Sequence, residues 1–168
     1  MSDMKEPIAH VRKSSTGEWA LHSLEEHCRS VAKLASDFAN PFGGSGWAYL
    51  AGLWHDLGKF LPEWQRYIRK ETGYDTESLE AHVEGANGRV NHSDAGMIWA
   101  FTRFSEPARR HVAKILAYLI GGHHAGLPDW EPDACGGDLV NRIYENPLDN
   151  RIHLDQVKQL ESLDATTM

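Results

Sequence analysis

The stretch Leu50-Ala51-Gly52-Leu53-Trp54-His55-Asp56-Leu57-Gly58-Lys59-Phe60 decides how this 168-residue chain is interpreted. Its apolar side chains recur at the three- to four-residue spacing of a helix face, and they lead directly to His55 and Asp56. Gly58 follows where the helix should end, and glycine is favoured just after a helix. The stretch therefore predicts a helix from about residue 46 that carries a histidine and a carboxylate in its last turn.

The sequence on both sides of this stretch also predicts helices. Ser23 and Glu26 form a capping box, and Pro62 and Pro107 stand where a first helical residue is favoured. The helices are expected at about residues 23–38, 46–56, 62–68, 93–101, 107–120, 139–144 and 157–163. Because no alternating strand pattern is convincing, we expect an all-α helical bundle, with residues 1–168 forming a single domain.

Composition limits the class of protein. The chain is 41% hydrophobic and 24% charged, which is typical of a globular protein. Its formal net charge of -7 argues against coating DNA through bulk positive charge, although a small pocket with bound cations is still compatible with it. No apolar run is long enough for a bilayer and no secretory signal is visible, so we expect a cytoplasmic protein. Two cysteines, Cys28 and Cys135, are too few for a disulfide framework.

Ten histidines are the unusual feature of the composition. His27 falls on the apolar face of the first predicted helix, His92 stands at the start of another, and His123 and His124 follow a third. Each alone has an ordinary interpretation, such as a satisfied core histidine, a helix-end residue or a solvated loop. Together with Asp56, however, the five histidines offer six ligands, enough for two metal ions. We expect His22, His82, His111 and His153 at the surface, whereas His10 is left ambiguous.

The order His27, His55-Asp56, His92, His123-His124 resembles that of the HD-domain metallophosphohydrolases, an all-α superfamily. His55-Asp56-Leu57-Gly58-Lys59 looks like its HD-x-G-K motif. Gly122-His123-His124-Ala125-Gly126-Leu127-Pro128 resembles the double-histidine segment of the HD nuclease domain of CRISPR-associated nuclease-helicases from type I systems. Ala9-His10, followed by Leu24-Glu25-Glu26-His27, is similar to the opening of that domain. The resemblance covers roughly residues 8–130.

The resemblance implies a metal-dependent nuclease that hydrolyses phosphodiester bonds of single-stranded DNA in type I CRISPR antiviral defence. It implies that one ion is held by His27, His55 and Asp56. A second ion would be held by Asp56, His92, His123 and His124. Such imidazole-rich sites favour Mn, Ni, Co, Fe or Zn over Mg. Asp56 and Lys59 would be catalytic, with Lys59 contacting a phosphate, although Lys59 could equally be a cation that complements a helix dipole.

The resemblance also implies partners and a further ligand. A helicase domain or subunit and the CRISPR surveillance complex would deliver the strand, since residues 1–168 contain no helicase. The family usually has a later aspartate ligand, for which Asp164 is the candidate; otherwise the chain is a fragment that lacks a C-terminal helix. Two alternatives are left open: an HD phosphohydrolase acting on nucleotides or cyclic dinucleotides, and an inactive metal-bound interaction domain. The cyclic-dinucleotide branch carries a Gly-Tyr-Pro string that this chain lacks.

Overall fold

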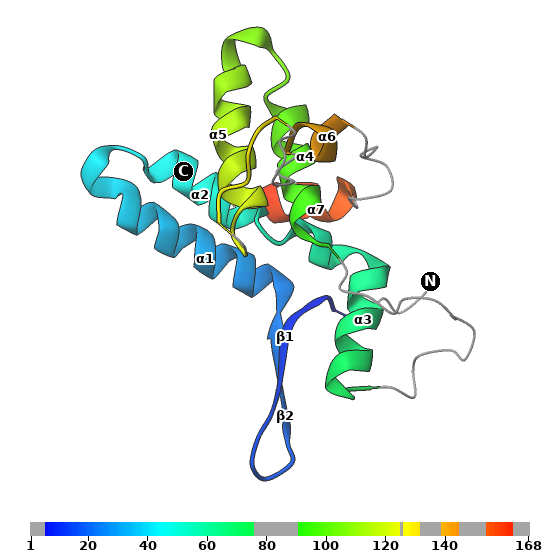
Figure 1. Cartoon of the computed structure of the whole chain (residues 1–168). Helices are drawn as coiled ribbons and strands as arrows, with labels where there is room; N and C mark the ends of the chain where they lie inside the picture. Colours follow the sequence, from blue (N-terminus) through cyan, green and yellow to red (C-terminus); the bar gives the residue numbers. More distant parts are fainter. Residues whose placement is uncertain (1–5, 76–90, 125, 132–138, 145–153, 163–168) are drawn as a thin grey trace.

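A computed structural model describes residues 6–75, 91–124, 126–131, 139–144 and 154–162 (Figure 1). The helices are α1 (Leu24–Ala39), α2 (Ser45–Trp54), α3 (Pro62–Thr72), α4 (Ser93–Arg103), α5 (Arg110–Gly121), α6 (Leu139–Tyr144) and α7 (Leu154–Ser162). Short 3-10 helices lie at η1 (Asn40–Phe42), η2 (Leu57–Phe60) and η4 (Pro107–Arg109). The prediction of a mainly helical HD bundle is confirmed. Over these ranges, none of the helices combines the length and apolar character needed to cross a membrane.

The prediction that the chain has no strand is wrong. Strands β1 (Ile8–Lys13) and β2 (Trp19–Ser23) form an antiparallel hairpin that projects from the bundle at the start of α1 (Figure 1). Gly17 has a φ of 89°, a left-handed conformation that suits glycine in the turn. The strands are short and only half-buried, so their alternation is too weak to be recognised in the sequence.

Two helix pairs form the body of the bundle, α1 against α2 and α4 against α5. Gly52 allows the first pair to approach closely, because a Cβ atom there would lie 2.7 Å from the Cα of Ala32. Gly96 has the same role between α4 and the end of α2, where a Cβ would collide with the carbonyl oxygen of Trp54. These close approaches bring the ends of α2 and α5 and the start of α4 toward one another.

The helix faces that pack inward match the apolar stripes predicted by the three- to four-residue spacing only in part. In α1 that spacing predicts a stripe from Leu24 to Phe38; Leu24 and Cys28 are buried, but Leu34 and Phe38 are 55% and 72% exposed. In α5, Ile115 and Leu119 are also exposed. The buried positions include Cys28, Ala32 and Ala39 in α1 and Ala113, Leu116, Ala117 and Ile120 in α5. Small residues such as Ala32, Ala113 and Ala117 thus share the inward faces with Leu116 and Ile120, while other large apolar side chains lie outside the contact.

Candidate metal centre

His55 and Asp56 lie where α2 gives way to η2. His55 is the C-cap of α2, and Asp56 follows it with its side chain only 2% exposed. The predicted role of Gly58 as a helix C-cap is wrong, because it lies inside η2. Its lack of a side chain matters for another reason: its backbone N–H donates to the carbonyl oxygen of His92 at 3.2 Å, and a Cβ would collide with that backbone.

One group of ligands, which we call the α1–α2 half, gathers around the Oδ2 atom of Asp56. His27 Nε2 lies 3.0 Å from this oxygen and His55 Nε2 lies 3.1 Å from it. The two imidazole nitrogens are 3.2 Å apart. Donors bound to one ion at about 2.0–2.1 Å lie roughly 3 Å from one another, so this triangle has the dimensions of a metal site.

A second group, the α4–α5 half, gathers around the other oxygen of the same carboxylate. Asp56 Oδ1 lies 3.4 Å from His92 Nε2 and 3.6 Å from His123 Nε2. His92 is the N-cap of α4, and its Nε2 atom is 2.6 Å from that of His124. The two groups are therefore contiguous and share Asp56, with one oxygen facing each.

Backbone carbonyls orient two of the histidine rings. His55 Nδ1 lies 2.6 Å from the carbonyl oxygen of Gly52, and His123 Nδ1 lies 2.6 Å from that of Ile120. A carbonyl can only accept, so in each ring Nδ1 carries the proton and donates. The lone pair is then on Nε2, the nitrogen that faces Asp56, as a metal ligand requires.

The electrostatics of Asp56 favour its ionised form. Burial by itself raises the pKa of this carboxyl, but the imidazoles of His123, His27 and His55, when they carry a proton on Nε2, outweigh it and hold the pKa well below its ordinary range. Lys59 adds a cation, with Nζ 2.8 Å from Oδ2. Among the described residues, neither Asp56 Oδ1 nor His123 Nε2 has a hydrogen-bond partner, although both atoms are buried. Buried polar atoms without a partner are costly, and a bound cation would satisfy both.

The structure brings the six predicted ligands together, and the chemistry of the donors fits divalent cations. Imidazole nitrogens dominate, with one carboxylate between the two groups, which suits Mn, Fe, Co, Ni or Zn. Asp56 and His92 form the buried floor, whereas His124 is exposed at the rim.

Lys59 lies in the last turn of the 3-10 helix η2 rather than in α2, and it is 5% exposed. Its ammonium group pairs with Asp56 and lies 5.0 Å from the ring centroid of Trp64, which is itself buried. Its predicted contact with a phosphate stays a prediction. The alternative in which Lys59 is a cation that complements a helix dipole stays a prediction as well.

Sequence reasoning missed the ion pair that supports His92. Asp94, in the first turn of α4, accepts from Arg142 Nε at 2.9 Å and from Asn91 Nδ2 at 2.9 Å. Arg142 comes from α6, and it also donates to Ser93 Oγ at 3.1 Å. Because no local pattern links residues 94 and 142, the only available signal was an acidic residue in a helix first turn.

Two further histidines lie beside the α1–α2 half. The rings of His10 and His22 are 4.7 Å and 5.4 Å, centroid to centroid, from the ring of His27. His22 was expected at the surface with no link to the ligands, so that prediction is wrong. Burial is the main cause that lowers the pKa of His10, and Lys59 and His27 lower it further.

Basic residues of α5 contact aromatic residues of α4, of α6 and of the segment that follows α5. Lys114 Nζ lies 4.1 Å from the ring centroid of Trp130, which also stacks on Phe101 at 5.6 Å and contacts Tyr118 at 5.6 Å, centroid to centroid. Arg110 donates to the hydroxyl of Tyr144 at 3.2 Å. These side chains thus help to hold α5 against the segments that follow it.

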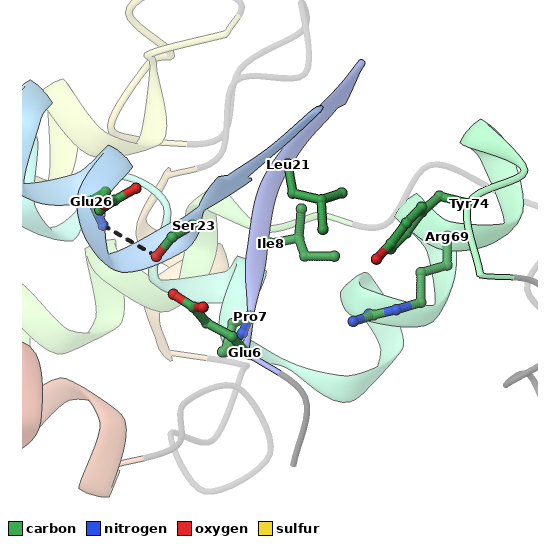
Figure 2. Close-up of a pocket in the computed structure, with 8 residues that line it drawn as sticks. All are labelled: Glu6, Pro7, Ile8, Leu21, Ser23, Glu26, Arg69 and Tyr74. Atoms are coloured by element: carbon green, nitrogen blue, oxygen red, sulfur yellow. Dashed lines mark hydrogen bonds between the residues drawn. The ribbon is translucent and has the colours of Figure 1, made fainter. Parts of the chain in front are cut away.

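A cavity lies apart from the metal centre, between the hairpin and α3. Figure 2 shows its lining, in which Ile8 and Leu21 of the hairpin face Arg69 and Tyr74. None of the six predicted ligands lines it. The close-up also shows the N-cap of α1, where Ser23 Oγ accepts from the backbone N–H of Glu26 at 3.5 Å, as the capping box predicts.

The predictions for Asp164, His82, His153 and Cys135 fall outside the described residues. Cys28, the other cysteine, is a buried free thiol, and burial raises its pKa to about 12. Such a thiol packs as a small apolar side chain and is a poor nucleophile, in agreement with its expected place in the core.

Comparison with known proteins agrees with the geometry of the centre. A family model described as "Cas3, HD domain" matches residues 13–159, which is most of the chain. A search of curated proteins found no match. The matched range includes all six predicted ligands and Lys59. The chain therefore belongs to the Cas3 HD-domain family of metal-binding CRISPR nuclease domains.

Proposed function

We propose that this chain is a nuclease domain that hydrolyses phosphodiester bonds of single-stranded DNA in type I CRISPR antiviral defence, with two divalent ions at the His/Asp centre. The observation that carries the proposal is Asp56, whose Oδ2 atom faces His27 and His55 while its Oδ1 atom faces His92 and His123. Two groups of donors that share one carboxylate are what a two-metal phosphodiesterase needs.

The residues of the chain have separate roles in this proposal. His27 and His55 would hold one ion with Asp56, and His92, His123 and His124 the other. When bound, divalent ions supply Lewis-acid charge that activates water and stabilises the charge developing on phosphoryl oxygens. Asp56 contributes an ionised carboxylate, and the carbonyls of Gly52 and Ile120 keep the rings of His55 and His123 oriented.

Lys59 is proposed to act in two ways at the floor of the centre. Its contact with Asp56 Oδ2 orients the carboxylate, which has further lone pairs for a metal ion. Its charge also attracts an incoming phosphate. A Lys59→Met variant should therefore lose activity, whereas Lys59→Arg, which keeps the charge, should recover part of it.

The partners follow from the same proposal. A helicase domain or subunit, together with the CRISPR surveillance complex, would supply the single strand. We place the reaction in the cytoplasm. The exposed side of the centre at His124 is where the strand would enter.

The test compares substrates side by side on the full chain with Mn²⁺ or Ni²⁺. Linear and circular single-stranded DNA, a cyclic dinucleotide and a deoxynucleoside triphosphate are incubated with the wild type, Asp56→Ala and the exposed control His111→Ala. We expect metal-dependent cleavage of DNA by the wild type and the control, and none by Asp56→Ala.

Three results would contradict the proposal. Cleavage that persists in chelator or in Asp56→Ala would place the activity elsewhere. Faster turnover of the cyclic dinucleotide or the triphosphate would favour a small-molecule phosphohydrolase. Stoichiometric metal binding without turnover of any substrate would favour an inactive interaction domain.

A further inference from the structure

Three histidines gather where the hairpin meets α1, and two of them, His10 and His22, lie outside the two groups described above. His10 in β1 and His22 in β2 are cross-strand partners, with ring centroids 6.0 Å apart. His27, one turn into α1, completes the triangle at 4.7 Å from His10 and 5.4 Å from His22. Each ring offers a nitrogen within 4.8 Å of one from each of the other two.

Local backbone structure holds this triangle in place. Ser23 ends β2 and is also the N-cap of α1, so no loop separates His22 from the helix that carries His27. The backbone N–H of Leu24 donates to the carbonyl oxygen of Pro7 at 2.9 Å, which ties the start of α1 to the chain before β1. A register shift between Ile8 and His10 gives the pairing of His10 with His22.

The environment of the triangle suits a cation better than a packed core. His10 is exposed and His22 is half-buried, so both rings can exchange water for a metal ion. Within the described chain, no hydrogen bond to a protein group occupies the ring nitrogens of His10 or His22. Three imidazoles without a carboxylate form a donor set that suits Zn, Cu, Ni or Co and is a poor match for Mg or Ca.

We propose that His10, His22 and His27 form a third cation site, at the open edge of the metal centre, for a borderline transition metal such as Ni²⁺, Co²⁺, Cu²⁺ or Zn²⁺. Three protein ligands leave a coordination position open to solvent. His27 Nε2 faces Asp56 and His55, so His27 serves this outer site through its other ring nitrogen, Nδ1, when both sites are filled. Its ring N–H proton is then lost to solvent.

The test is a Ni²⁺ titration of the full chain by calorimetry and equilibrium dialysis. The variants are His10→Ala/His22→Ala, the matched control His111→Ala, and Asp56→Asn, with circular dichroism to confirm that each is folded. The wild type and His111→Ala should bind one equivalent more than the double variant. Asp56→Asn should still bind the additional Ni²⁺ ion, because its outer site is intact. In a separate Co²⁺ titration, the absorption bands of the ion in the outer site should be missing only from His10→Ala/His22→Ala.

Equal Ni²⁺ stoichiometry and equal affinities in the wild type and the double variant would overturn the proposal. An outer equivalent that disappears in His111→Ala would also overturn it, because that histidine lies outside the triangle. The titration needs no nuclease activity. A failed third site is therefore distinguishable from a failed nuclease proposal, which is tested on substrates.

Discussion

The two halves of the metal centre share one carboxylate but are built in different ways. The α1–α2 half comes from two consecutive helices, and its donor atoms lie 3.0–3.2 Å apart. The α4–α5 half takes its donors from the residues just before η2 and α4 and just after α5, and Asp56 lies 3.4 Å and 3.6 Å from two of its histidines. The first half therefore depends on one helix contact, and the second on several long-range contacts.

Different glycines secure the two halves. Gly52 lets α2 touch the backbone of Ala32, which sets the distance from His27 to His55. Gly58 lets η2 touch the backbone of His92, and the pair of Arg142 with Asp94 secures the same end of α4 from α6. The comparison shows that the geometry at Asp56 can be perturbed on one side without the other.

Removal of the shared carboxylate should have the largest effect, because it damages both halves together. Asp56→Asn keeps the volume of the side chain but removes its charge and one ligand oxygen. We expect nuclease activity to fall on the order of 10⁴-fold, the scale seen for a central catalytic group. Mn²⁺ titration should show weakened binding of two equivalents. Loss of a single equivalent would mean that Asp56 does not bridge the halves.

Single ligand substitutions should separate the halves. His55→Ala should weaken one Mn²⁺ equivalent and His124→Ala the other, each with an activity loss of at least about 100-fold, because a direct ligand matters more than a residue that merely orients one. The combined variant His55→Ala/His124→Ala should bind neither ion. The exposed His111→Ala is the control for loss of a histidine. If both single variants weakened the same equivalent, the division into halves would be wrong.

Acidification should weaken metal binding by the α4–α5 half first, because this half has three imidazole ligands and the α1–α2 half has two. Imidazole binds metal only when neutral, so activity should fall about tenfold or more between pH 7.5 and 5.5. Asp56 should not cause this loss, because its pKa is held below its ordinary range and it stays ionised throughout.

The lowered pKa of Asp56 also determines the direction in which the stability of the protein changes with pH. A carboxyl with a lowered pKa in the folded state contributes stability that is fully present above the unfolded value of about 3.9, and it is lost as the pH falls below that value. A pH–activity profile from pH 7.5 to 5.5 measures the first effect, and thermal unfolding in chelator at pH values above and below about 3.9 measures the second. An activity loss centred below pH 4 would instead implicate Asp56.

The glycine contacts should give the smallest and most selective effect. A Cβ at Gly52 pushes α1 away from α2, and a Cβ at Gly58 displaces His92. Each Ala variant should lose about 1–3 kcal/mol of unfolding free energy by overpacking. Gly52→Ala should weaken binding of the ion in the α1–α2 half, and Gly58→Ala should weaken binding of the ion in the α4–α5 half.

Gly46→Ala is the matched control for these variants, since no atom lies within 4 Å of a Cβ there. As a glycine inside α2, it should gain about 0.5–1 kcal/mol on substitution. Chemical denaturation and Mn²⁺ titration together check the set. Equal weakening of both ions by Gly52→Ala and Gly58→Ala would show that the halves move as one unit.

The sequence alone determined the helices, because their signals are local. The Ser23 cap, the prolines at residues 62 and 107 and the three- to four-residue spacing act within a few residues of one another. The identity of the six candidate ligands was also predictable, since each stands at a helix end or on a helix face. Their grouping into two halves was implied by the family resemblance.

Only the tertiary structure decided how these local elements meet. The packing of α1 and α5 leaves Leu34 and Ile115 exposed, although the local spacing places both on an apolar stripe. The tertiary structure joined Arg142 to Asp94, and it brought His10 and His22 to His27 through a hairpin whose strands are too short to recognise in the sequence. Such contacts depend on packing between residues far apart in the chain. No local spacing encodes that packing.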